Sequence, residues 1–279
     1  MTIPAKSRLR ILCLHGFTSN ASVHAFQLRR LISSLSQDQN QSYDFLFPSG
    51  PHTVLPSSAS MDMTSPATQL WHDFVVGLSP ESEKLGHRAW WYARDPDWKT
   101  KRKGEFEGLE ESFQFLGKFL EGLDGPVDAV WGFSQGACLA GMLVALLQDS
   151  QREHPLRKML PERQGSVKCG VIFSGFRARF EMYDDIYEVT NADSGWKGID
   201  VPVMHVIGEK DPLVGSERSV ALMRCCREEE VLRFEGGHEI PKGEEDVAKI
   251  VEFVRRYCEV GGKGEDEGMG EGRRVQASM

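Results

Sequence analysis

The sequence predicts an α/β fold in which helices flank a mostly parallel central sheet. Short apolar runs, bounded by glycine and proline, alternate along the chain with segments whose apolar residues recur at the spacing of an amphipathic helix. This alternation is typical of βαβ units, in which successive strands pair in parallel. The composition agrees, since 40% of the 279 residues are hydrophobic, enough to form a sizeable core.

A strand, a helix and a second strand are predicted near the N-terminus. Residues 10–14 form an apolar run that stops at His15-Gly16, as expected for a buried strand that ends in a loop. A segment with one apolar helix face follows, marked by Leu28, Leu31, Ile32 and Leu35. Residues 44–47 are a second apolar run, and proline and glycine close it.

Residues 49–104 lack clear periodicity, and we expect an irregular insertion there. Its second half contains Trp71, Trp90, Trp91 and Trp98. A loop of this length is usually functional or disordered, and disordered segments contain few aromatic residues. We therefore expect residues 61–98 either to wall an apolar pocket or to pack as ordinary core against the sheet.

The rest of the chain continues the alternation of helices and strands. Helices are predicted over residues 109–120, 140–147, 216–226 and 244–257. Strands are predicted over residues 127–131, 169–173, 203–208 and 231–234. Glycine and acidic residues are frequent near the C-terminus. We therefore predict a single domain over residues 1–260 and a flexible, acidic, glycine-rich tail over residues 261–279.

Charge and cysteine content exclude several classes of function. With 33 basic against 41 acidic residues, a net charge of −8, the chain lacks the surplus of Lys and Arg that nucleic-acid binding requires. No apolar stretch is long enough to cross a bilayer, and no secretory signal core is present. The six cysteines lack C-x-x-C spacing, so we expect reduced thiols in a cytoplasmic protein without a metal. Nucleotide and phosphate motifs are also absent, so no cofactor is predicted.

The most informative motif is Gly132-x-Ser134-x-Gly136. The apolar run at 127–131 leads into it and an apolar helix follows, which is the strand–turn–helix context of a nucleophile elbow. The serine of such an elbow occupies a strained turn, where side chains two residues to either side would collide. The alternative is a glycine-rich turn that only closes a βα unit. The context favours Ser134 as a nucleophile.

A serine nucleophile needs a base, and His238 is the best placed of the eight histidines. It follows the predicted strand 231–234 through a glycine pair, so it lies on a loop at the carboxyl end of a strand. We expect His15 to shape a loop and His205 to lie in the core. No special role is predicted for His24, His52, His72, His87 and His154.

The base in turn needs an acid that fixes its tautomer, and Asp211 is the candidate. It follows the predicted strand 203–208 and precedes a proline, so a helix N-cap is its alternative role. The competing acids are Glu209 nearby and, further away, Asp184, Asp185, Asp193 and Asp200. The order Ser134, Asp211, His238, each after a successive strand, is that of the α/β-hydrolase fold and favours Asp211.

Negative charge on a reacting carbonyl oxygen must be met by preorganised donors. We expect one donor to be the backbone N–H of Gln135, the residue after Ser134. The second is expected in the loop after the first strand, at the backbone N–H of Phe17. Neither side chain is required for this role.

Seven motifs occur in order along residues 10–258. They are L-C-L-H-G-F (12–17), R-A-W-W (88–91), G-P-V-D-A-V-W-G-F-S-Q-G-A (125–137), F-S-G-F (173–176), H-V-I-G-E-K-D (205–211), E-R-S (217–219) and F-E-G-G-H-E-I-P (234–241). This pattern resembles the fungal family of serine hydrolases. The resemblance implies an α/β-hydrolase with little or no separate cap domain and a triad of Ser134, Asp211 and His238. Members include esterases and thioesterases that release polyketide chains.

The sequence and the resemblance together predict a serine hydrolase that cleaves an acyl ester or thioester through an acyl-enzyme. The hypothetical substrate is an acyl or polyketide chain on the acyl carrier domain of a polyketide synthase, in secondary metabolism. One alternative is a general short-chain carboxylesterase, and another is cofactor-free peroxidation on the same triad. A third is a non-catalytic ligand-binding protein, because a fold does not by itself establish an activity.

Overall fold

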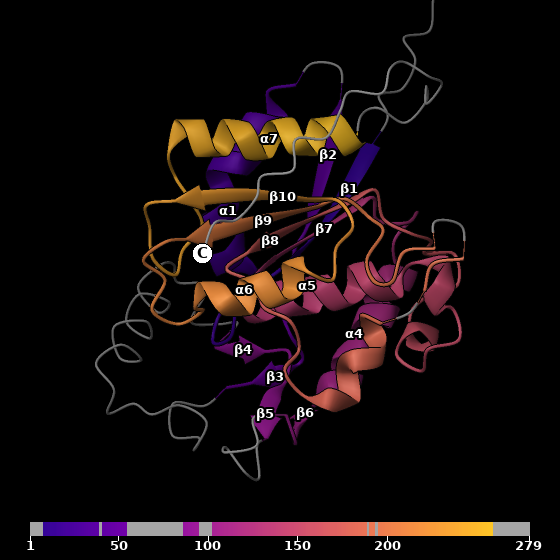
Figure 1. Ribbon diagram of the computed structural model, residues 1–279. Helices are drawn as coiled ribbons and strands as arrows, with labels where there is room; N and C mark the ends of the chain where they lie inside the picture. Colours follow the sequence, from indigo (N-terminus) through magenta and orange to yellow (C-terminus); the bar gives the residue numbers. More distant parts are fainter. Residues whose placement is uncertain are drawn as a thin grey trace, which may run out of the picture.

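The centre of the molecule is a six-stranded sheet in the order β10-β9-β8-β7-β1-β2, and every neighbouring pair is parallel (Figure 1). The strands are β1 (Arg8–Leu14), β2 (Ser42–Leu46), β7 (Ala129–Phe133), β8 (Cys169–Phe173), β9 (Val203–Gly208) and β10 (Glu229–Phe234). The computed structural model describes residues 8–38, 41–54, 86–94, 102–188, 190–192 and 195–258. The predicted α/β class with a mostly parallel sheet is confirmed.

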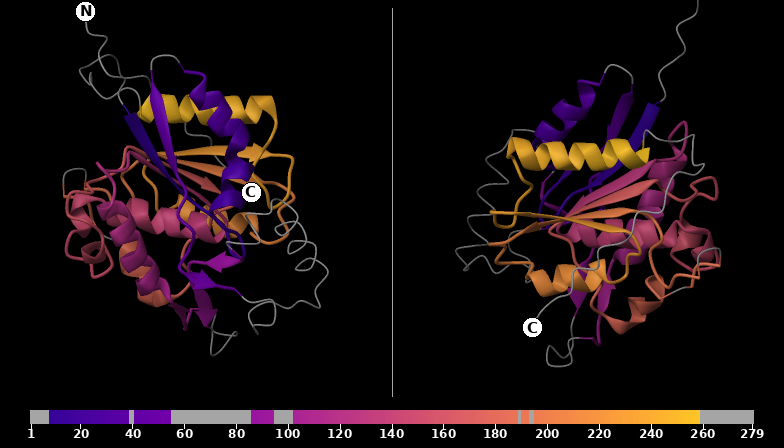
Figure 2. Two further views of the ribbon diagram at one scale, coloured as in Figure 1. Left: turned by 180° about the vertical axis from the view of Figure 1, so that it is seen from behind. Right: turned by 45° about the horizontal axis from the view of Figure 1, so that its top comes forward.

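Helices cover both faces of this sheet (Figures 1 and 2). One face carries α1 (Ala21–Ser36) and α7 (Glu244–Cys258), and the other carries α4 (Leu109–Glu121), α5 (Gln135–Leu146) and α6 (Ser216–Met223). Alternate residues of a strand point to opposite faces of a sheet. Ile11 accordingly belongs to the apolar core under α1 and α7, whereas Leu12 belongs to the core under α4 and α5.

The region predicted as an irregular insertion, together with the residues just after it, contains short strands that the sequence did not indicate. β3 (His52–Thr53) pairs antiparallel with β4 (Arg88–Ala89), and β5 (Tyr92–Arg94) pairs antiparallel with β6 (Glu105–Glu107). These strands are two or three residues long, too short to display the alternation by which a strand is recognised. They lie below the sheet in Figure 1, beside α4 and α6.

The other predicted helices and strands are present. β8 and β9 have the predicted bounds, and the others have shifted ends. The strand expected at 127–131 is displaced: β7 continues to Phe133, so the sheet reaches the residue before Ser134. Three 3-10 helices follow α5 and were not predicted, because runs this short leave no periodicity to detect. They are η1 (Asp149–Gln151), η2 (Arg157–Met159) and η3 (Glu181–Ile186).

Some expectations fall on residues that the structure does not describe. The tail at 261–279 lies outside the described residues, as do Trp71 and Trp98. The assignment of residues 1–260 to one domain stays a prediction. Among the helices of the described residues, none combines the length and the apolar composition that a membrane crossing requires.

Candidate active site

Ser134 lies on a sharp turn between β7 and α5. Its backbone angles are φ 55° and ψ −113°, a conformation that residues other than glycine rarely adopt. The turn is held from outside, since the Ser134 N–H donates to the Phe173 carbonyl at 3.0 Å and every residue of α5 is buried. A side chain at Gly136 would overlap the Leu14 and His15 carbonyl oxygens. The glycine is therefore needed for the close approach.

The structure brings Ser134, Asp211 and His238 together, although 104 residues separate the serine from the histidine. His238 Nε2 lies 2.9 Å from the Ser134 hydroxyl oxygen, and His238 Nδ1 lies 2.8 Å from Asp211 Oδ2. A carboxylate only accepts hydrogen bonds, so Nδ1 carries the ring proton and the Nε2 lone pair faces the hydroxyl. The three residues follow β7, β9 and β10, whose carboxyl ends meet at one edge of the sheet.

The Asp211 carboxylate is enclosed and well supplied with donors. Its side chain is 2% exposed, and its Oδ1 accepts hydrogen bonds from the N–H groups of Leu213 and Val214 at 2.8 and 2.9 Å. Burial raises the pKa of Asp211, but the hydrogen bonds from His238 and from the backbone outweigh it and leave the pKa below its usual value. The alternative role of Asp211 as a helix N-cap is wrong, because the N-cap of α6 is Gly215. Asp211 instead caps the turn before this helix.

The loop after β1 approaches the serine closely and is held by a buried histidine. A Cβ at Gly16 would lie 3.3 Å from the Ser134 Cβ. His15 accepts from the Gly50 N–H at 2.8 Å and contacts the Gly16 carbonyl at 2.7 Å, so it shapes the loop as expected. Burial lowers the pKa of His15 to about 3, so the ring is neutral. Phe17 and Gln135, whose N–H groups are the predicted oxyanion donors, both line the cavity that contains Ser134.

The Gln135 side chain has a role that sequence reasoning missed. Its amide oxygen accepts from the Trp90 N–H at 2.9 Å, and its amide nitrogen donates to the Trp91 carbonyl at 2.9 Å. The Trp90 indole N–H donates to the His15 carbonyl at 2.9 Å. These hydrogen bonds connect the start of α5 to Trp90 and Trp91, and Trp90 to the loop after β1. A polar side chain at the start of a wholly apolar helix was the available signal, because a buried amide must find partners.

The cavity in front of Ser134 has a volume of about 460 Å³. Phe17, Trp91, Phe176 and Leu213 form apolar parts of its wall. Trp91 therefore fits the predicted wall of aromatic residues, whereas Trp90 is fully buried in the core. Three arginines also line the cavity: Arg94, Arg179 and Arg218. No role was predicted for them, although Arg218 belongs to the E-R-S motif.

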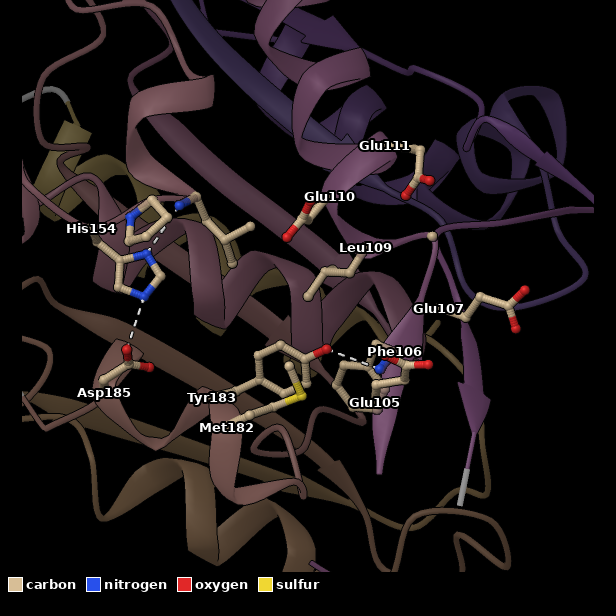
Figure 3. Close-up of a pocket in the computed structure, with 13 residues that line it drawn as sticks. Glu105, Phe106, Glu107, Leu109, Glu110, Glu111, His154, Met182, Tyr183 and Asp185 are labelled. Atoms are coloured by element: carbon tan, nitrogen blue, oxygen red, sulfur yellow. Dashed lines mark hydrogen bonds and ion pairs between the residues drawn. The ribbon is translucent and has the colours of Figure 1, made fainter. Parts of the chain in front are cut away.

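A second cavity of about 500 Å³ shares Phe106 with the first (Figure 3). Carboxylates dominate its polar lining: Glu105, Glu107, Glu110, Glu111 and Asp185. Figure 3 shows His154 in this cavity, paired with Asp185 at 3.4 Å through its Nε2. The structure therefore holds a second histidine–aspartate pair, in a place where the sequence predicted no special role for His154.

A strained serine at a strand–helix turn, with the aspartate and histidine after later strands of a parallel sheet, is the arrangement of an α/β-hydrolase. Comparison of folds agrees. Acyl-protein thioesterase 2 of Zea mays has a TM-score of 0.56 with this chain at 15% sequence identity, and the match covers 92% of this chain and 97% of the maize chain. A similarity at that identity establishes the shared fold.

The chain belongs to the serine hydrolase (FSH1) family, whose model matches residues 1–250. Esterase OVCA2 of Danio rerio is 27% identical over 252 residues, which cover 89% of this chain and 97% of the fish protein. A hydrolase of Schizosaccharomyces pombe is 26% identical over 252 residues, and the chain spans about half of it, 51%. The prediction of a serine hydrolase family is confirmed, and the fish esterase shows that similar proteins occur outside the fungi.

Proposed function

We propose that this serine hydrolase cleaves acyl esters or thioesters through an acyl-enzyme formed on Ser134. The observation that carries the proposal is the continuous hydrogen-bond chain from Asp211 through His238 to the serine hydroxyl, with contacts of 2.8 and 2.9 Å. A serine hydroxyl is a weak nucleophile at neutral pH and becomes reactive when a base accepts its proton. The esterase name of the fish relative supports the same reaction class.

Each residue has a defined step in this reaction. Ser134 Oγ attacks the acyl carbonyl while His238 Nε2 takes its proton, and the Asp211 carboxylate stabilises the imidazolium that results. The N–H groups of Phe17 and Gln135 stabilise the oxyanion. His238 then protonates the leaving alcohol or thiol, and the acyl-enzyme remains. Water, deprotonated by His238, releases a carboxylic acid and restores Ser134.

Labelling with a fluorophosphonate tests the nucleophile and the non-catalytic alternative together. The probe forms a covalent adduct with an activated serine, so we expect wild-type protein to be labelled and Ser134→Ala to stay unlabelled. Ser33→Ala serves as a control, because Ser33 is an exposed serine of α1 outside the cavity of Ser134. Equal labelling of wild type and Ser134→Ala would reject Ser134 as the nucleophile.

For the substrate, we propose an acyl or polyketide chain that is held as a thioester on a carrier protein, in the cytoplasm. The resemblance of the motifs to polyketide-releasing thioesterases supports this substrate, and so does the apolar wall formed by Phe17, Trp91 and Phe176. A general carboxylesterase is the second candidate, favoured by the name of the fish relative.

Matched substrates separate the two candidates. An acyl-N-acetylcysteamine thioester and the oxygen ester of the same acyl chain differ only in the atom that leaves. We expect a higher kcat/KM for the thioester. Equal or faster turnover of short oxygen esters would identify a carboxylesterase instead.

A further inference from the structure

The cavity of Ser134 is basic although the chain as a whole carries a net charge of −8. Its three arginines come from separate elements: Arg94 from β5, Arg179 from the loop after β8, and Arg218 from α6. Their environments differ. Arg94 forms an ion pair with Glu107, so its charge is already compensated. Arg218 is half-buried and forms no ion pair within the described residues, although the charges of Glu217 and Asp211 act on it from further away.

Arg218 is held firmly with donors to spare. Its guanidinium lies over the Phe176 ring, 4.2 Å from the centroid, and its Nη1 donates to the Leu213 carbonyl at 3.3 Å. The next residue, Ser219, donates its hydroxyl to the Gly175 carbonyl at 2.8 Å and fixes α6 against the loop after β8. A guanidinium has five N–H donors, so most of those of Arg218 have no protein acceptor within the described part of the chain.

The electrostatic setting of Arg218 disfavours its charged form. Burial lowers the pKa of Arg218, and the nearby positive charge of Arg179 lowers it further. Cys138, Glu217 and Asp211 act in the opposite direction, but the pKa stays below its usual value. Burial and Arg179 both work against the charged form, yet an arginine remains charged in proteins. A negative group in the cavity would remove both penalties at once, because it would pair with a desolvated cation and offset the repulsion between two cations.

We propose that Arg218 makes this site selective for acyl substrates that carry a negatively charged group, which the guanidinium binds beside Phe176 and Leu213. The inference rests on the proposed function, since it names the chemistry of the substrate that Ser134 cleaves. The anion has two possible sources: a carboxylate at the far end of the acyl chain, or the phosphate of a phosphopantetheine leaving group. Both offer oxygen atoms that match the planar fork of an arginine.

Two pairs of substrates, each with a charged and a neutral member, test the proposal. 4-Nitrophenyl hemiglutarate and 4-nitrophenyl 5-methylhexanoate differ in the charge of the acyl end, and an acyl-phosphopantetheine and its acyl-pantetheine differ in the charge of the leaving group. The readout is the ratio of kcat/KM for the charged over the neutral member. We expect Arg218→Gln to lower this ratio roughly tenfold to a hundredfold in one pair, which identifies the source of the anion.

Two further variants separate charge from structure. Arg218→Lys keeps a positive charge and should retain part of the preference, although a lysine cannot reproduce the planar fork. Arg224→Gln removes a positive charge from the exposed C-cap of the same helix, outside the cavity, and should leave the ratio unchanged. If Arg218→Gln slows both members of each pair equally, Arg218 only supports the Leu213 loop and the proposal is wrong.

A binding measurement keeps this inference distinct from the proposed function. Glutarate and phosphopantetheine can be titrated calorimetrically into Ser134→Ala protein, in which no turnover is required. We expect one of them to bind, and the additional change Arg218→Gln to weaken that binding by a similar factor. Binding that is equal with and without Arg218 overturns the inference even if ester turnover is observed. If the wild-type protein does not hydrolyse even neutral esters, that result counts against the proposed function instead.

Discussion

The two cavities that share Phe106 are each lined by the histidine of a histidine–aspartate pair, but the two pairs differ in their hydrogen bonds. In the Ser134 cavity, His238 Nδ1 donates to Asp211 and its Nε2 faces a serine hydroxyl at 2.9 Å. In the carboxylate-lined cavity, His154 Nδ1 accepts the Leu156 N–H at 3.2 Å, and its Nε2 faces Asp185 (Figure 3). The lining charges are also opposite.

The difference shows what makes such a pair a candidate base. A neutral imidazole has one lone pair, and that lone pair must face the proton to be taken. In His154 a backbone N–H already occupies it, so no lone pair remains for a substrate. In His238 the lone pair faces the Ser134 hydroxyl instead. The two pairs therefore differ in the group that faces the unprotonated ring nitrogen, and the aspartate alone does not distinguish them.

Substituting the aspartate of each pair gives the largest expected contrast. Asp211→Asn removes the acceptor that fixes the His238 tautomer, so we expect kcat for an ester substrate to fall by about 10⁴-fold. Asp185→Asn, the matched change in the other cavity, should alter kcat by less than about twofold, because within the described part of the chain His154 bonds to Asp185 and to the Leu156 N–H and not to a nucleophile. Steady-state hydrolysis of one ester by both variants measures the contrast.

Thermal unfolding of both variants provides the control, since Asp211 also caps the Leu213–Val214 turn. A fall in kcat of Asp211→Asn that follows only from partial unfolding would appear as a loss of folded protein. A large loss of kcat in folded Asp185→Asn would contradict the division between the two pairs.

The candidate site was predictable where it depends on chain order at strand ends. Ser134, Asp211 and His238 each follow a buried strand, and the carboxyl ends of parallel strands meet at one edge of a sheet. Such strands leave a clear mark in the sequence, because both of their faces are buried and nearly all their residues are apolar. The same signal predicted the fold class. It did not predict where β7 ends and α5 begins, because residues of the motif around Ser134 belong to both elements.

Features that depend on contacts between distant segments were not predictable. The Gln135 side chain finds its partners at Trp90 and Trp91, and nothing in local periodicity places that segment beside α5. Arg218 lies on a short helix whose sequence reads as an ordinary exposed surface. The pair of His154 and Asp185 lies next to 3-10 helices, which carry no periodic pattern.

Removing the side chain that both cavities share should have a smaller but clear effect. Phe106 is 5% exposed and stacks on Trp91 and Tyr183, with centroid distances of 4.8 and 5.0 Å. We expect Phe106→Ala to lower the free energy of unfolding by about 3–5 kcal/mol and to join the cavities. Phe106→Leu, which keeps most of the volume, should lose less. Urea denaturation measures the loss for both variants. A loss below about 1 kcal/mol for Phe106→Ala would contradict the importance of this ring for the packing between the two cavities.

The smallest expected effect is a dependence of stability on pH, and it concerns a residue near the Ser134 cavity. His15, behind that cavity and 4.9 Å from Trp90 between ring centroids, has its pKa lowered from 6.5 to about 3 by burial. Between these two values the unfolded chain binds a proton at residue 15 and the folded chain does not. Acidification therefore favours unfolding, by up to about 1.4 kcal/mol per pH unit.

The test of this effect is a comparison of slopes. His24 and His205, each with a pKa lowered to about 4 by burial, act in the same direction, so wild-type stability should fall steeply from pH 7 to pH 5. His15→Asn removes one of the three contributions, and its urea-denaturation free energy should depend less steeply on pH. Because the substitution also disturbs the loop after β1, only the slopes are compared, not the absolute stabilities. Parallel slopes for the two proteins would show that His15 takes up its proton without unfolding, and the loop beside Ser134 would then tolerate a charged imidazole.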